Sequence, residues 1–174
     1  LYTRYFLPDE YAIVVELYAY VAFLVIILTY GIETAFFRFS NKIADIKSVY
    51  STALYSVITT SCIFIALTFV YSSSISNLLG SAILTEYIQW FAIIVAFDAI
   101  SSIPFARLRE RERALQFSLI KLINISTNIA LNLYFIVYKG FGIEYIFISN
   151  LVASVVTLLL LTPEIFKATF SFDF

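Results

Sequence analysis

The sequence predicts an all-α integral membrane protein, a polytopic bundle of transmembrane helices. Hydrophobic residues make up 61% of the 174 residues and charged residues only 13%, with a mean hydropathy of +0.93. Soluble domains carry about 25% charged residues. Apolar runs of the length that crosses a bilayer recur along the chain. Because isolated strands would leave backbone groups unpaired in lipid, we expect every span to be helical.

Five runs are long enough to span a bilayer, and together they predict one transmembrane domain over residues 1–174. Residues 1–7 have the pattern of the end of a preceding span. The chain has no methionine and starts in mid-pattern, so we expect an internal fragment of a longer protein. Residues 72–85 predict a wetter loop, in which 75–79 forms a short amphipathic turn at the membrane interface. The spans are 11–32, 49–71, 87–106, 114–138 and 143–162.

Composition also excludes several classes of function. A net charge of −1 argues against a nucleic-acid partner, which requires a strongly basic face. The chain has no histidine and one cysteine, Cys62, so disulfides and histidine or cysteine metal sites are not expected. No glycine-rich phosphate loop or activated nucleophile is visible. We therefore expect no enzyme activity, no cofactor and no bound metal.

The charges between the spans predict the orientation of the chain, because lysine and arginine collect on the cytoplasmic side. If the span count is right, eight basic residues fall on one side and two, Arg4 and Lys139, fall on the other. The turn at 107–113 holds four of the eight, and we expect it to anchor the cytoplasmic side. The eight residues are Arg38, Lys42, Lys47, Arg107, Arg109, Arg111, Arg113 and Lys167.

Three segments resemble bacterial polysaccharide-biosynthesis flippases, the oligosaccharide-lipid branch of the superfamily that contains the multidrug and toxin extrusion transporters. These segments are 1–12 (LYTRYFLPDEYA), 29–39 (TYGIETAFFRF) and 103–113 (IPFARLRERER). The resemblance implies that the five spans are helices two to six of the N-terminal six-helix half of a 12–14-helix transporter. It also implies a multi-pass protein of the bacterial cytoplasmic (inner) membrane.

The activity implied by the resemblance is the flipping of an undecaprenyl-diphosphate-linked oligosaccharide, a polysaccharide or O-antigen precursor, by alternating access. The expected partners are this lipid-linked oligosaccharide and membrane lipids. Two alternatives stay open. One is a cation-coupled antiporter for drugs or other small molecules, and the other is a membrane-embedded glycosyltransferase or polymerase of the cell envelope.

Two ionisable residues are expected at the same depth inside the bilayer. Asp98 lies eight residues before Ala106, and Lys121 lies seven residues after Ala114. At 1.5 Å per residue both are roughly 10–12 Å from the arginine-rich turn. A salt bridge between them would offset much of the cost of burial. Such a pair either holds the hairpin together, or is a charged element of the transport cavity or a site of ion coupling (proton or sodium).

The fourth span carries a polar stripe, because Lys121, Asn124, Asn128 and Asn132 follow one another at helical spacing. The asparagines either join neighbouring helices by hydrogen bonds or line a cavity where amides bind sugar hydroxyls.

The charged residues at the predicted cytoplasmic ends of the spans each have two possible roles. Glu33 and Arg38 bracket the inner end of the first span. In the resembling family this motif borders the central cavity, so Arg38 either contacts a pyrophosphate or anchors the helix at the headgroups. The turn at 107–113 is either solvated beside anionic lipid, since its arginines and glutamates alternate, or binds the lipid diphosphate. Pro104 is a candidate hinge.

Overall fold

The computed structural model describes residues 5–40, 46–79 and 85–168, and every regular element in these ranges is helical. Five helices are long and apolar enough to cross a membrane, which confirms the predicted fold class. The elements are α1 (Pro8–Thr29), α2 (Ile32–Ser40), α3 (Ile46–Leu79), α4 (Thr85–Glu110), α5 (Ala114–Asn132) with its π-helical continuation η2 (Leu133–Tyr138), and α6 (Glu144–Ile165).

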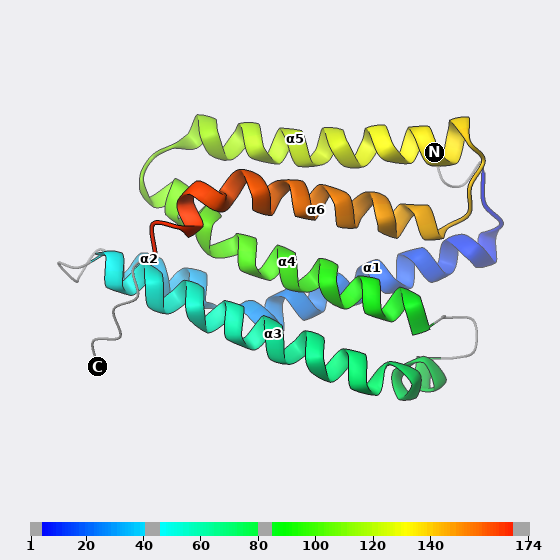
Figure 1. Cartoon of the computed structure of the whole chain (residues 1–174), viewed down its shortest axis with the longest axis horizontal. Coiled ribbons are helices and arrows are strands. Elements are labelled where there is room, and N and C mark those ends of the chain that lie inside the picture. The colour runs from blue at the N-terminus through cyan, green and yellow to red at the C-terminus, as the bar shows by residue number, and fades with distance from the viewer. Residues whose placement is uncertain (1–4, 41–45, 80–84, 169–174) are drawn as a thin grey trace.

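Helix α4 forms the centre of the bundle. In Figure 1, α5, α6, α4 and α3 follow one another across the molecule, and α1 also packs against α4. Small and apolar side chains of α4 face these neighbours, and Val95, Ala99 and Ile103 are fully buried at steps of four residues. About 72% of the membrane-spanning part of α4 is buried, against 17% for α1 and for α5. The outer helices therefore expose broad apolar faces that suit lipid.

The first predicted span is one helix, α1, and a turn separates it from the short helix α2. Helix α1 ends at Thr29, and the chain turns through Tyr30 and Gly31, which both have positive φ, 32° and 72°. Glycine adopts this left-handed conformation at little cost and commonly ends a helix. The predicted end at residue 32 was therefore wrong by three residues. The short helix α2 that follows carries Glu33 and Arg38.

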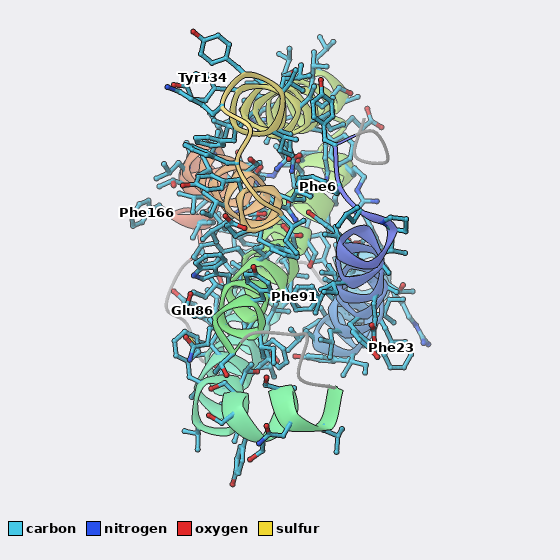
Figure 2. All side chains as sticks on the ribbon, turned by 90° about the vertical axis from the view of Figure 1, so that its right-hand side faces the viewer. Phe6, Phe23, Glu86, Phe91, Tyr134 and Phe166 are labelled. Carbon is cyan, nitrogen blue, oxygen red and sulfur yellow. The ribbon has the colours of Figure 1, made fainter. Side chains whose placement is uncertain are left out.

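Helix α3 is longer than the predicted span 49–71 and continues through Ser72 to Leu79, where a loop was expected. The helix tolerates serines here because their hydroxyls can bond back to the preceding turn, as Ser72 does to the carbonyl of Phe69 at 3.0 Å. Figure 2 shows the last turns of α3 running across the view in which the other long helices are seen end-on. This direction agrees with the expected interfacial segment at 75–79. Residues 80–84 of the predicted loop lie outside the described residues.

The arginine-rich turn between α4 and α5 is a tight helix end. Glu112 adopts φ 56°, and its amide donates to the carbonyl of Arg109 at 3.1 Å. The Arg113 amide donates to the carbonyl of Leu108 at 2.9 Å. These two bonds form a Schellman motif with glutamate at the position that usually holds glycine. The chain reverses here as predicted, but α4 continues to Glu110, so the turn is confined to residues 111–113 rather than 107–113.

Candidate functional site

A polar cavity of about 520 Å³ lies among α1, α2, α4, α5 and α6. Four apolar residues contribute to its wall: Ala22, Val25, Phe105 and Phe117. A mostly polar cavity wall is unusual inside a helix bundle of this composition, because polar groups are costly in hydrocarbon. Ten polar residues line the rest, namely Glu33, Asp98, Ser101, Ser102, Arg109, Lys121, Asn124, Asn150, Ser154 and Thr157.

Asp98 and Lys121 face this cavity but do not form the predicted salt bridge. The carboxylate of Asp98 accepts a hydrogen bond from the Ser154 hydroxyl at 2.9 Å, which joins α4 to α6. The ammonium of Lys121 instead lies over the ring of Phe105, 4.4 Å from its centre. A neighbouring hydroxyl and a ring face replace the expected ion pair, because α6 lies beside α4 where Asp98 projects. Both charges thus remain open to the cavity.

The asparagine stripe of α5 divides into two parts. Asn124 lines the cavity beside Lys121 and donates to the Ala153 carbonyl at 3.0 Å and the Thr157 hydroxyl at 2.8 Å. Asn128 and Asn132 lie beyond the cavity wall. The asparagines of this helix face thus bond to neighbouring groups, as one prediction had it, and Asn124 also lines the cavity, where sugar binding stays a prediction.

Beyond the cavity, the asparagines bond to one another and across to α6. Asn128 donates to the side-chain oxygen of Asn150 at 3.2 Å. Asn132 is buried and donates to the backbone and side-chain oxygens of Asn128, at 2.8 and 2.7 Å. This network holds α5 on α6, where amide pairs can satisfy one another away from water.

At the end of the cavity nearest the turn at 107–113, Glu33 pairs with Arg109 rather than with Arg38. The guanidinium of Arg109 donates to the Glu33 carboxylate at 2.5 Å, so α2 is joined to α4. Both side chains are more than one third exposed, which limits the stability that the pair contributes. Arg38 is exposed and does not line the cavity. It forms no ion pair with the residues that the structure describes.

A second charged group lies at the same end of the bundle. Glu164 is 1% exposed and faces three cations: Arg107 at 3.7 Å, Arg113 at 3.5 Å and Lys167 at 2.5 Å. We call Glu164, these three cations and Tyr50 the Glu164 cluster. Arg107 is only 2% exposed, so the prediction of a fully solvated arginine turn was wrong for this residue. The buried carboxylate of α6 supplies its counter-charge.

Tyr50 joins α3 to the Glu164 cluster. Its hydroxyl donates to the backbone carbonyl of Glu164 at 3.0 Å, and the guanidinium of Arg107 lies over its ring, 4.0 Å from the centre. Arg107 also donates to the same carbonyl at 3.4 Å. Helices α3, α4 and α6 are thus joined at one buried point.

The other cations of this region are more accessible. Arg111 is exposed, whereas Arg113 and Lys167 are about half exposed.

The sequence analysis missed Glu164. The last span was predicted to end at 162, which left Glu164 outside it, but α6 continues through Pro163 to Ile165. One signal was available: a single carboxylate at the end of a span, with Lys167 three residues later. The buried arginine of the turn required such a counter-ion.

The donors and acceptors of the cavity suit a hydrophilic ligand. Hydroxyls, amides and the two carboxylates, Glu33 and Asp98, can bind sugar hydroxyls, and Lys121 and Arg109 offer positive charge. No group of three or more histidine, cysteine or acidic side chains placed to hold a metal ion occurs in the described ranges. The chemistry of the site is therefore that of a polar binding pocket.

A family model described as "Polysaccharide biosynthesis protein" matches residues 1–172. The chain belongs to this family. The match covers nearly the whole chain and agrees with the pathway that the sequence resemblance implied. Comparisons with curated proteins and with solved structures each gave no significant match. This member of the polysaccharide biosynthesis family is therefore a multi-pass membrane protein with a polar cavity among its spans.

Proposed function

We propose that the protein moves a lipid-linked oligosaccharide across the membrane, as a flippase. The observation that carries the proposal is the polar cavity of about 520 Å³, set among helices able to cross a membrane, in a chain of this family. A glycan head group cannot cross hydrocarbon unaided, and a polar cavity that opens to each side in turn lets it pass. The protein supplies a path and no covalent chemistry.

The wall of the cavity supports this class of substrate. Asn124, Asn150 and the nearby hydroxyls supply neutral donors and acceptors for sugar hydroxyls. Lys121 and Arg109 supply the positive charge that a diphosphate needs. The aliphatic tail of the substrate would stay in the bilayer beside the bundle. The substrate is a lipid-diphosphate-linked oligosaccharide.

The orientation is part of the proposal: the chain lies in a bacterial inner membrane with the turn at 107–113 in the cytoplasm. The bias of basic residues toward that side supports it. Ser74, an exposed residue near the opposite end of α3, would then lie outside. A cysteine at Ser74, with Cys62 replaced by alanine, should react with an impermeant thiol reagent added outside the cell. Reaction only with reagent on the cytoplasmic side would show that the chain has the opposite orientation.

Translocation by the whole transporter in proteoliposomes tests the function itself. A fluorescent lipid-linked oligosaccharide becomes accessible to an impermeant quencher when it reaches the outer leaflet. Lys121→Gln should slow this step by about tenfold or more, the effect of one hydrogen bond to a charged group. The matched control is Lys139→Gln, because Lys139 is exposed at the opposite end of the bundle and lies outside the cavity.

Two results would contradict the flippase. One is transfer of the lipid-linked oligosaccharide at the same rate in empty vesicles and in vesicles that hold the transporter. The other is exchange of an organic cation for protons with no movement of the lipid, which would favour the antiporter. The presence of Asp98 in the cavity, a carboxylate beside Ser154, gives that rival its specific support.

A further inference from the structure

The Glu164 cluster holds more positive charge than its carboxylate neutralises. Three cations surround Glu164, and Arg107 alone, which is buried with it, is enough to balance its charge. The turn at 107–113 together with Glu164, Lys167 and Glu33, the partner of Arg109, contains five cations and four carboxylates. A local excess of positive charge attracts an anion.

Arg113 and Lys167 are the two cations that an external anion can reach. Their side chains are 47% and 40% exposed, whereas Arg107 is 2% exposed. Their nitrogens lie 3.5 and 2.5 Å from the same Glu164 oxygen, so they are at most 6.0 Å from one another. The Glu164 oxygen offsets part of the repulsion between these two cations, and their exposed N–H groups can donate to a phosphate oxygen on the outer side.

The start of α5 adds further positive potential at this point. Arg113 is the residue at which α5 begins, and no side chain caps the free amides of the first turn. The amino end of a 19-residue helix carries a partial positive charge and favours anions. Phe117 near this end of α5 and Ile165 at the end of α6 pack against the same buried apolar cluster. The helix end and the two cations thus act on the same volume.

Exposed apolar side chains on both sides of these cations identify the anion as a lipid. Phe166, next to Lys167, is 81% exposed, and Figure 2 shows it projecting outward from α6. Leu115, two residues after Arg113, is 82% exposed. A cationic pair between large exposed apolar side chains, at the end of two helices able to cross a membrane, matches the boundary between headgroups and acyl chains.

We propose that Arg113 and Lys167 bind the phosphate group of an anionic phospholipid at the Glu164 cluster. The site is separate from the polar cavity, because none of the residues of the Glu164 cluster lines that cavity. Arg113 and Lys167 share their donors between the lipid phosphate and Glu164, while Arg107 and Tyr50 keep the carboxylate in place from inside. The bound lipid neutralises the excess charge and joins the start of α5 to the end of α6.

Lipid binding to the whole protein tests this proposal. Native mass spectrometry in a neutral detergent would follow the uptake of phosphatidylglycerol, with phosphatidylcholine as the uncharged reference. The variant Arg113→Gln with Lys167→Gln should bind phosphatidylglycerol about 30-fold more weakly, which is about 2 kcal/mol, or about 1 kcal/mol for each basic side chain near an anionic surface. Thermal unfolding without added lipid shows whether the variant is folded.

Two further variants separate this site from a general effect of charge. Arg38→Gln removes an exposed cation of α2 that is absent from the Glu164 cluster, and it should bind the lipid as the parent does. Arg113→Lys with Lys167→Arg keeps both charges and should retain most of the affinity. If the double glutamine variant does not fold, Lys167→Gln alone replaces it, with an expected loss of about fivefold.

Three results would overturn the proposal. The first is equal loss of lipid in Arg38→Gln and in the double glutamine variant. The second is uptake of phosphatidylcholine as strong as that of phosphatidylglycerol. The third is displacement of the lipid by millimolar inorganic phosphate, which would assign the cations to a free anion. We expect phosphate to leave the lipid bound, because Phe166 and Leu115 hold its acyl chains.

Discussion

The polar cavity and the Glu164 cluster both place charges between α4 and α6, but they satisfy those charges differently. In the Glu164 cluster one carboxylate has three cationic partners, and its innermost pair is at most 2% exposed. In the cavity, Asp98 accepts a hydrogen bond of 2.9 Å from Ser154, and Lys121 contacts a ring face. Charges surrounded by opposite charges are held in place, whereas charges without an ionic partner are free to bind a ligand.

The largest expected effect follows from breaking the Glu164 cluster. Glu164→Gln leaves Arg107 buried without its counter-charge, and should lower the free energy of unfolding by about 3–5 kcal/mol. Equilibrium unfolding in mixed micelles measures this loss. The control is Glu33→Gln, which removes the exposed partner of Arg109 and should cost about 1 kcal/mol or less. Similar losses in the two variants would remove the distinction between a buried and an exposed ion pair.

A smaller effect is expected for the bond between Asn128 of α5 and Asn150 of α6, which joins the two helices at the edge of the cavity. A double-mutant cycle with Asn128→Ala and Asn150→Ala should give a coupling energy of about 0.6 kcal/mol, the usual value for such bonds in membranes. The free energies of unfolding of the parent, the two single variants and the double variant give this coupling energy. Strictly additive losses would show that the 3.2 Å contact does not hold the helices together.

The sequence predicted the class of fold and the position of the spans well, because length and hydropathy largely determine both. Helix ends were predicted less well. Gly31 lies inside an apolar run, and hydropathy does not record its left-handed turn. The serines after residue 71 looked like a loop by composition, although each hydroxyl can bond to its own helix.

Within the candidate site, the sequence found which polar groups lie in the membrane but not their partners. The spacing of Lys121, Asn124, Asn128 and Asn132 correctly placed them on one face of α5. Which of them line the cavity depends on where α6 lies, and spacing along one helix does not give that position. For the same reason, matching depth alone suggested an ion pair between Asp98 and Lys121, which Ser154 and Phe105 replace.

The central claim is that the polar side chains between α4, α5 and α6 line a substrate cavity. Cysteines at Ser102, which lines the cavity, and at Ser149, which is fully buried, test it most directly in the whole protein with Cys62 replaced by alanine. Both serines bond to a carbonyl of their own helix, so the two substitutions are matched.

The measurement is the rate of reaction with a small, charged, water-soluble thiol reagent, with and without lipid-linked oligosaccharide. The cysteine at Ser102 should react faster than the one at Ser149, and the oligosaccharide should slow that reaction. Equal rates at the two positions, or a rate at Ser102 that the oligosaccharide leaves unchanged, would contradict the cavity as the substrate site.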